Sequence, residues 1–144
     1  MDIIRIEDFQ EIYENDEISE LLGTAMFNPT PGKIQSLAQS IYAKTQGRFF
    51  IARHEGVLVG LAGFSKIDNH KLILKHLAVL GTYQRQKVAS NLLDSIIDSE
   101  KIQMIEAETD DEGVGFYKGY GFKVTKLPFD DARGQRYLCV FTVK

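Results

Sequence analysis

The sequence predicts an α/β domain of the α+β type, in which helices cover both faces of a mixed central β-sheet. Three observations lead to this prediction. Apolar residues occur both in short strand-like runs and at helical spacing, a glycine-containing link joins two neighbouring strand runs, and a strand–helix–strand series follows. A hairpin pairs its strands antiparallel, whereas a strand–helix–strand connection pairs them parallel, so the two together require a mixed sheet.

The first part of the chain predicts one strand and two helices. Residues 3–6 form a short strand run, and apolar residues then recur at helical spacing across 9–22, a helix that Asp8 can cap. Residues 28–31, with two prolines, break the chain. Apolar positions across 34–42 fall on one face of a second helix, which begins with a proline in its first turn.

The remainder of the chain predicts most of the sheet. Residues 48–53 and 57–66 are apolar runs on either side of His54-Glu55-Gly56, which predicts a hairpin. A strand over 72–80 follows, then a helix from Gln86 and a strand over 102–109. A short helix and two strand runs ending at Phe141 complete the order β α α β β β α β α β β.

Composition narrows the class of protein. The chain has 144 residues, a length typical of one domain, and 17 basic against 20 acidic residues, a net charge of -3. A general nucleic-acid binder usually carries a basic excess, and no apolar run approaches the roughly 20 residues that span a bilayer. The acidic N-terminus and the single cysteine, Cys139, predict a cytoplasmic protein without disulfides.

The strand–turn–helix junction across 77–90 is a candidate anion site. The first backbone N–H groups of a helix have no partner inside it, and the helix dipole adds roughly half a positive charge there. Ala89 and Ser90 let the backbone approach a phosphate, while Arg85 and Lys87 can donate charge-assisted bonds. An ordinary strand-to-helix turn shares these features, so the junction alone leaves both interpretations open.

A second segment, Phe116-Tyr117-Lys118-Gly119-Tyr120-Gly121-Phe122, follows some thirty residues on. Thr109 and Glu112 have the spacing of a capping box, which predicts the start of a short helix there. Gly121 suits the left-handed position that ends this helix before Phe122 enters a strand. On its own, Tyr117 is more readily interpreted as a core residue with a satisfied hydroxyl than as a catalytic acid.

Together these segments resemble the GCN5-related N-acetyltransferase (GNAT) family. Its acyl-coenzyme A signature is Gln or Arg, two residues, Gly, one residue, then Gly or Ala, and here it stands as Gln84-Arg85-Gln86-Lys87-Val88-Ala89. Lys87 replaces the usual glycine, which has a freer backbone. The second segment is similar to the family's aromatic pair, three residues, Gly-Phe. The resemblance covers most of the chain and implies the acyl-CoA N-acyltransferase (GNAT) fold as a single domain over residues 1–144.

The resemblance also implies an activity, an N-acetyltransferase with acetyl-CoA as co-substrate and no metal. In related folds a backbone amide of the strand before the loop bonds the acyl carbonyl, here Val79, and the matching tyrosine, Tyr117, protonates the departing thiolate. Cys139 is predicted to be a core residue, so the acceptor amine attacks directly. The implied coenzyme-binding residues are Leu77, Ala78, Val79, Gln84, Arg85, Gln86, Lys87, Val88, Ala89 and Ser90.

The general base stays open at this point. His76 lies beside the proposed carbonyl site and titrates in a suitable range, while Glu106 and Glu108 share one face of the strand over 102–109. A histidine on a strand is more often structural, and alternating glutamates usually mark a solvated face. His76, Glu108 and a water relay are therefore all retained as hypotheses.

The acceptor is expected to be a primary amine of a small molecule or peptide. Acidic runs near residues 14–17 and 110–112 could attract a cationic amine, but helix capping and solubility explain such runs equally well. Two other functions remain open, a catalytically silent acyl-CoA-binding regulatory domain and an interaction module without a ligand. No nucleic-acid or membrane partner is expected, and a homodimer would follow if the run over 136–143 is an edge strand.

Overall fold

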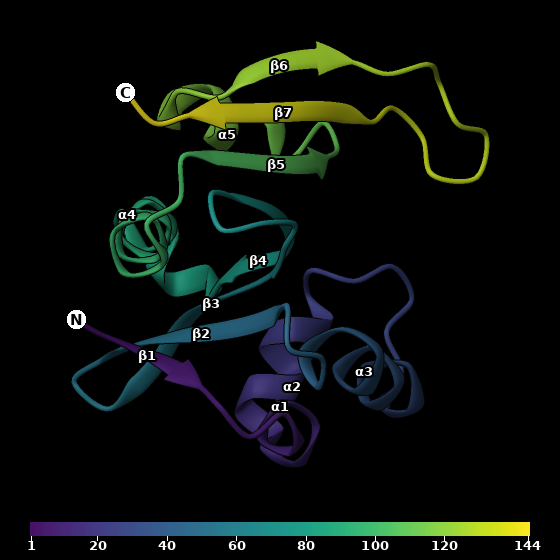
Figure 1. Ribbon diagram of the computed structural model, residues 1–144. Coiled ribbons are helices and arrows are strands. Elements are labelled where there is room, and N and C mark those ends of the chain that lie inside the picture. Colours follow the sequence, from purple (N-terminus) through teal and green to yellow (C-terminus); the bar gives the residue numbers. More distant parts are fainter.

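A seven-stranded mixed sheet forms the centre of the protein, whose computed structural model describes residues 1–144 (Figure 1). The strand order is β1-β2-β3-β4-β5-β7-β6, and every neighbouring pair is antiparallel except β4 and β5. This arrangement confirms the predicted mixed sheet. The strands are β1 (Asp2–Ile6), β2 (Gly47–His54), β3 (Val57–Lys66), β4 (Lys71–Val79), β5 (Met104–Thr109), β6 (Lys123–Lys126) and β7 (Tyr137–Thr142).

Helices cover both faces of the sheet, each over its own apolar core. One core joins α1, α2, α3 and η1 to β2, β3 and β4, and its side chains include Ile12, Leu22 and Phe49. The other joins α4 and α5 to the opposite face, where Phe64 and Leu92 are fully buried. The helices are α1 (Gln10–Glu14), α2 (Asp16–Gly23), α3 (Pro31–Leu37), the π-helical η1 (Ala38–Tyr42), the 3-10 turn η2 (Gly81–Tyr83), α4 (Val88–Glu100) and α5 (Val114–Tyr120). No helix has the length and apolar character needed to cross a membrane.

The first predicted helix is divided in two at Asn15. The backbone of Asn15 is extended, with φ -85° and ψ 115°, and its side-chain oxygen accepts the N–H of Ile18 at 3.1 Å. Asparagine is a preferred N-cap, so the side chain starts a new helix where apolar spacing alone predicts continuity. Asp8 accepts the N–H of Gln10 at 3.0 Å, close to the capping role expected of it.

The second predicted helix is also modified, at its C-terminal end. Thr30 caps α3 by accepting the N–H of Lys33 at 3.1 Å, with Pro31 in the first turn as expected. From Ala38 the chain continues as the π-helical turn η1, closed by a bond from Ala43 N–H to the Ala38 carbonyl at 2.9 Å. Single π turns are often found at functional sites.

The last strand, β7, lies inside the sheet and not at its edge. The sequence left open whether the run over 136–143 is an edge strand, but β7 lies between β5 and the short strand β6, which forms the edge instead. The structure excludes this possibility, which the sequence could not decide because strand order in a sheet depends on long-range pairing. The argument for a homodimer through this run falls with it.

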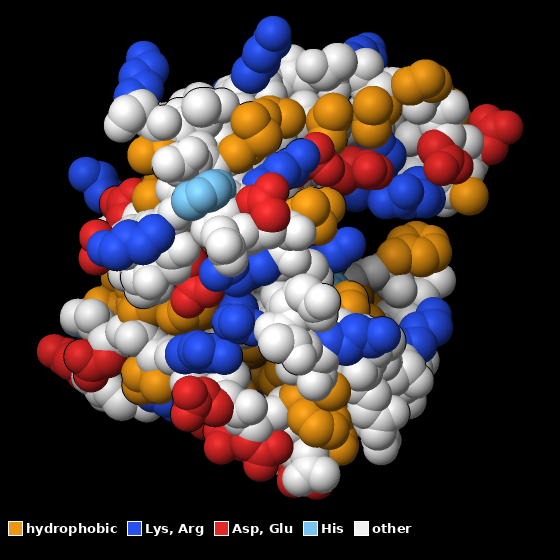
Figure 2. All heavy atoms as spheres, in the orientation of Figure 1, with side chains coloured by type: hydrophobic (Ala, Val, Ile, Leu, Met, Phe, Trp, Pro, Cys, Tyr) orange, Lys and Arg blue, Asp and Glu red, His pale blue; other side chains and the backbone are white.

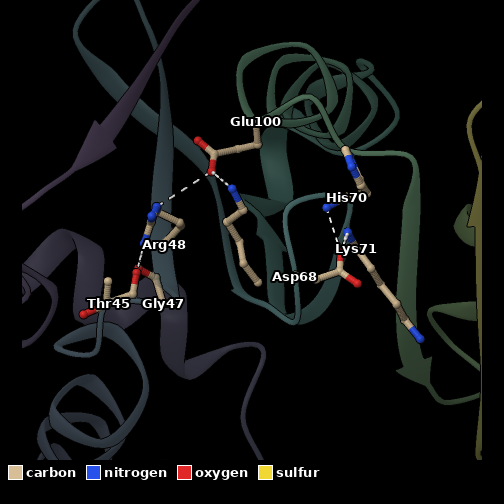
Figure 3. A network of polar contacts seen from close by, with 8 residues as sticks. Thr45, Gly47, Arg48, Asp68, His70, Lys71 and Glu100 are labelled. Atoms are coloured by element: carbon tan, nitrogen blue, oxygen red, sulfur yellow. Dashed lines mark hydrogen bonds and ion pairs between the residues drawn. The ribbon is translucent and has the colours of Figure 1, made fainter.

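Ion pairs fasten the C-terminal end of α4 to the sheet (Figure 3). Glu100 Oε1 lies 3.7 Å from Arg48 Nε on β2 and 3.5 Å from Lys66 Nζ on β3. Beside them, Asp68 Oδ1 accepts the N–H groups of His70 at 2.7 Å and Lys71 at 2.9 Å, which closes the turn before β4. The two Glu100 ion pairs hold the C-terminal end of α4 against β2 and β3.

The parallel pair β4 and β5 separates part-way along its length. Its ladder joins Lys71–Leu74 to Met104–Ala107 and stops there, although β4 continues to Val79 and β5 to Thr109. β4 stays paired with β3 as far as Val79, so the opening is between β4 and β5 only. Backbone groups on the facing edges of these strand ends are left without a ladder partner.

Candidate active site

The loop that leads into α4 presents a run of free backbone donors. Within the protein, the N–H groups of residues 85–90 donate no hydrogen bond, and the first bond of the helix runs from Asn91 N–H to the Lys87 carbonyl at 2.9 Å. No side chain caps this helix. An anion at this end would accept bonds from several amides and meet the positive end of the helix dipole.

Lys87 adopts the backbone conformation for which glycine is usually chosen. Its φ is 65° and its ψ 19°, in the left-handed region, and Arg85 has a φ of 66°. A residue with a Cβ pays roughly 1–2 kcal/mol there. Lys87 thus adopts the left-handed conformation in place of the glycine of the signature. The lysine at this position strains the backbone of the loop. Both side chains are exposed and free to reach a bound anion.

The end of β4 turns one amide toward the opening. The N–H of Leu80 bonds to the Val59 carbonyl on β3 at 2.8 Å. Since successive peptide groups of an extended strand point to opposite sides, the Val79 N–H and carbonyl are directed away from β3, toward the opening. The Gln84 side chain confirms this direction, because its Nε2 donates to the Val79 carbonyl at 3.4 Å. Leu77 and Val79 face the α4–α5 core, and Ala78 faces the other.

Tyr117 lies on α5 inside the α4–α5 core. Its side chain is 7% exposed and packs edge-on against Phe116 and Phe122, with ring centroids 5.3 and 5.0 Å away. Its hydroxyl has no partner in the protein, yet it is not among the buried atoms that lack one, so it reaches solvent. Burial raises the pKa of this hydroxyl, nearby Cys139 and Asp110 raise it further, and Arg136 opposes them. Tyr117 is thus a protonated phenol with a free donor.

The C-terminal end of α5 is formed as the sequence predicts, whereas its N-terminal end is not. The predicted capping box of Thr109 and Glu112 is wrong, because Asp110 Oδ1 accepts the N–H groups of Glu112 at 3.1 Å and Gly113 at 3.0 Å instead. Asp110, one residue later in the chain, thus takes the accepting role expected of Thr109, at the turn before α5. Gly121 ends the helix with a φ of 122°, which confirms the prediction for the C-terminal end.

His76 projects from β4 onto the face covered by α1, α2 and α3. Lys75 has no partner on β3, since Leu74 pairs with Phe64 and His76 with Gly63, and this bulge changes the alternation of side chains along β4. The Nδ1 atom of His76 lies 2.6 Å from the Tyr42 hydroxyl. Burial lowers the pKa of His76 to about 4, with a smaller contribution from the charge of Lys75. His76 is therefore neutral at physiological pH.

Glu108 lies near the end of β5, on the same face of the sheet as His76. Its neighbour Ala107 belongs to the α4–α5 core, so alternation places Glu108 on the other side. One carboxylate oxygen, Oε1, accepts from Arg136 Nε at 3.3 Å and lies 3.3 Å from Arg133 Nη2. The other oxygen has no partner in the protein. The side chain is 41% exposed.

Three residues of this region carry no signal in the sequence that marks them as part of a site. Tyr42 reads as one apolar position of a helix, and Arg133 and Arg136 read as solvated loop residues. Their contacts with His76 and Glu108 join residues distant in the chain, so they become visible only in three dimensions.

The surface around these residues is indented and of mixed charge. Figure 2 shows a hollow between the part built on β5, β6 and β7 and the part built on β1 to β4, with basic and acidic side chains interspersed. The acidic run at 110–112 has structural partners, because Asp110 closes the turn before α5 and Asp111 accepts from the Tyr137 hydroxyl at 2.6 Å. Asp110 and Asp111 therefore already accept hydrogen bonds within the protein.

Comparisons with known proteins agree with this geometry. The model of the acetyltransferase (GNAT) domain family matches residues 11–135, whereas no curated protein sequence matches. Among solved structures, an aminoglycoside 6'-N-acetyltransferase from Enterococcus faecium is 15% identical to this chain, with a TM-score of 0.76. The alignment covers 99% of this chain and 97% of that protein's chain. Ard1 from Thermoplasma volcanium is 22% identical with a TM-score of 0.71 at the same coverages, 99% and 97%. An aminoglycoside 6'-N-acetyltransferase complexed with coenzyme A is 15% identical with a TM-score of 0.74, again at 99% and 97%.

Proposed function

This chain belongs to the GNAT acetyltransferase family, and we propose that it transfers the acetyl group of acetyl-CoA to a primary amine of a small molecule or peptide by direct attack. The observation that carries the proposal is the separation of β4 and β5 beyond Leu74 and Ala107. It leaves unpaired strand edges between an anion-binding loop on one side and the two base candidates on the other.

The residues around the loop fit the coenzyme. A diphosphate offers several acceptor oxygens, and the unbonded amides of residues 85–90 offer the matching donors at a helix N-terminus. Arg85 and Lys87 add positive charge from exposed side chains. The proposed coenzyme site comprises Leu77, Ala78 and Val79 on β4 and residues 84–90 of the loop. Acetyl-CoA supplies the acetyl group as a thioester.

Val79 and Tyr117 suit the two ends of the reacting bond. When the amine nitrogen attacks the carbonyl carbon, negative charge grows on the carbonyl oxygen, and the Val79 N–H is directed toward the opening where it can stabilise that charge. The carbon–sulfur bond then breaks, and Tyr117 donates its proton to the leaving sulfur. Because burial raises the pKa of this hydroxyl, it carries that proton throughout the physiological range.

Glu108 is the better of the two base candidates. A primary amine with a pKa near 10 must lose a proton to attack, and the unbonded oxygen of Glu108 can accept it while Arg136 and Arg133 hold the other oxygen. His76 suits the role less, because its Nδ1 is already bonded to the Tyr42 hydroxyl and burial disfavours the charged form that it would take on accepting a proton.

Three measurements on the purified protein test this function. Native mass spectrometry would show retained coenzyme, and calorimetry with acetyl-CoA would show binding. A thiol-release assay over a panel of amines then reports transfer. Binding with amine-dependent thiol release supports the proposal. Binding without release on any amine supports a silent acyl-CoA-binding regulatory domain, and absence of binding supports an interaction module.

A further inference from the structure

Tyr42 and His76 form a close polar contact that the proposed reaction does not use. The Tyr42 hydroxyl lies 2.6 Å from His76 Nδ1, and the rings are tilted by 60° with centroids 5.8 Å apart. Tyr42 ends the π-helical turn η1, and His76 follows the bulge at Lys75 on β4. Two local irregularities, one in a helix and one in a strand, thus bring these side chains together.

A third feature makes room for the contact. Gly63 on β3 pairs with His76, and a Cβ added to Gly63 would overlap the Tyr42 hydroxyl oxygen and the adjoining ring carbon. Only glycine leaves space for the tyrosine at this position. Tyr42 is otherwise fixed by the core, with its ring edge-on to Phe49 at 5.0 Å.

The chemistry of the two groups allows Tyr42 to donate this hydrogen bond and Nδ1 of His76 to accept it. Burial raises the pKa of the Tyr42 hydroxyl, so it remains a phenol and can donate its proton. A neutral imidazole has one acceptor nitrogen and one N–H donor. With Nδ1 accepting from Tyr42, the proton of His76 resides on Nε2.

The Nε2 atom is available to a ligand. It has no hydrogen bond within the protein, and Arg48 Nε is the only buried side-chain nitrogen or oxygen without one, so Nε2 of His76 reaches solvent. The ring lies on the face of the sheet that also carries Glu108, beside the opening between β4 and β5. This is the side from which the acceptor would approach.

We propose that Tyr42 is a positioning residue that holds His76 as the neutral Nε2–H tautomer, and that this N–H donates a hydrogen bond to an oxygen of the acceptor near its amine. The inference rests on the proposed acetyl transfer and narrows the acceptor to amines that carry a hydroxyl, ether or carbonyl oxygen. A neutral donor selects an oxygen without requiring a charged substrate.

Nitrogen NMR of the histidine rings tests the tautomer without any assay of activity. In the wild-type protein the His76 ring is expected to show a protonated Nε2 and an unprotonated Nδ1 at neutral pH, assigned by loss of the signals in His76→Asn. Tyr42→Phe should restore a mixture of tautomers. Tyr13→Phe, a change on the same helical layer, should leave the His76 signals unchanged. A protonated Nδ1 in the wild-type protein would overturn the proposal.

A pair of matched amines tests the donated bond. 2-Methoxyethylamine and butylamine have similar length, and only the first has an oxygen, which can accept but not donate. The quantity compared is the ratio of kcat/KM for 2-methoxyethylamine to kcat/KM for butylamine. This ratio should be roughly fivefold higher in the wild type than in Tyr42→Phe or His76→Asn, which corresponds to the free energy of one neutral hydrogen bond. Comparing ratios between variants cancels the difference in amine basicity. Tyr13→Phe should keep the wild-type ratio.

The two arms separate this inference from the proposed function. Equal ratios in wild type, Tyr42→Phe and His76→Asn would overturn the donated bond, as would a loss confined to kcat that is the same for both amines. Turnover together with the wrong tautomer contradicts only the inference. The Nε2–H tautomer in a protein that acetylates no amine of the panel contradicts the proposed acetyl transfer, and the proposed recognition of an acceptor oxygen is then also overturned.

Discussion

Leu74 of β4 and Ala107 of β5 are the last paired residues of the parallel ladder, and beyond them the two strands separate. The candidate groups are arranged around this point. Val79 directs its amide into the opening, Glu108 follows Ala107 directly on β5, and Tyr117 lies in the core on the α4–α5 side. A single change in strand pairing thus leaves edges to which an acyl group and an amine could bind from opposite faces.

Tyr117→Phe should slow the reaction and spare coenzyme binding. The change removes only the hydroxyl, and general acid catalysis is typically worth about 100-fold or more in rate. We expect kcat to fall by about that factor, while the Kd for acetyl-CoA from calorimetry stays the same. Tyr120→Phe on the same helix, which loses a bond to Asp94, is the matched control and should keep kcat. Unchanged turnover in Tyr117→Phe would remove this residue from the mechanism.

Glu108→Gln should lower kcat/KM by about 100-fold at neutral pH, because the proposed base is lost. The deficit should shrink as the pH approaches about 10, where the free amine deprotonates without help. Glu106→Gln is the control, since Glu106 lies on the same face of β5 and pairs with Lys71 at 3.6 Å. Equal rates for the two variants across the pH range would assign the proton transfer to water.

Lys87→Gly should stabilise the protein, because glycine adopts a φ of 65° without the strain that a Cβ causes. We expect the free energy of unfolding to rise by about 1 kcal/mol or less. Lys101→Gly is the matched control, since Lys101 has a φ of 55° at the other end of α4. If the loop merely tolerates Lys87, coenzyme affinity should be unchanged or tighter in Lys87→Gly. A large loss of affinity in this variant alone would show that the lysine binds phosphate.

The low pKa of His76 makes stability depend on pH in a defined window. The unfolded chain takes up the proton near pH 6.5, whereas the folded protein takes it up only near pH 4, so the free energy of unfolding falls as the pH drops from 6.5 to 4. The loss is about 3 kcal/mol at most. Urea titrations at several pH values should show that the free energy of unfolding depends less steeply on pH in His76→Asn than in the wild type. His54→Asn should keep the wild-type dependence. The same slope in both variants would contradict a buried neutral His76.

Gly63→Ala should destabilise the protein by about 1–3 kcal/mol, because the new methyl group overlaps Tyr42 and the core must shift. The His76 tautomer should change with it, since Tyr42 can no longer keep its place. Gly32→Ala in α3 is the control, where nothing lies within 4 Å of the added Cβ and helix propensity favours alanine. Thermal unfolding measures the stability of both variants, and nitrogen NMR reports the tautomer. A stable Gly63→Ala protein with an unchanged tautomer would show that the space beside Tyr42 is larger than the structure implies.

Local signals in the sequence predicted much of the fold. The hairpin at Glu55 and Gly56 has positive φ angles of 52° and 82°, as a tight turn requires, and Gly121 ends α5 with positive φ. Apolar spacing located most of the strands and helices because burial on one face depends on neighbours in the chain. Asn15 escaped notice because the same residue fits inside a helix or at its cap, and only the bond to Ile18 decides.

The arrangement of the site could be predicted only in part. The sequence could nominate the loop over 84–90 and Tyr117 because their motifs are contiguous in the chain. The contacts of Glu108 with Arg133 and Arg136, and of His76 with Tyr42, join residues far apart in sequence, so no local pattern encodes them. The interior place of β7 is of the same kind. Cytoplasmic location, absence of nucleic acid and metal, and a homodimer stay predictions.

The most direct test of acetyl transfer is mass spectrometry of an amine incubated with the protein and acetyl-CoA labelled with carbon-13 in the acetyl group. We predict that the label appears in an amide of the amine, in step with released coenzyme A, and that Tyr117→Phe forms this product much more slowly at the same bound coenzyme. Release of coenzyme A without labelled amide, or no release with any amine, would contradict the proposed function.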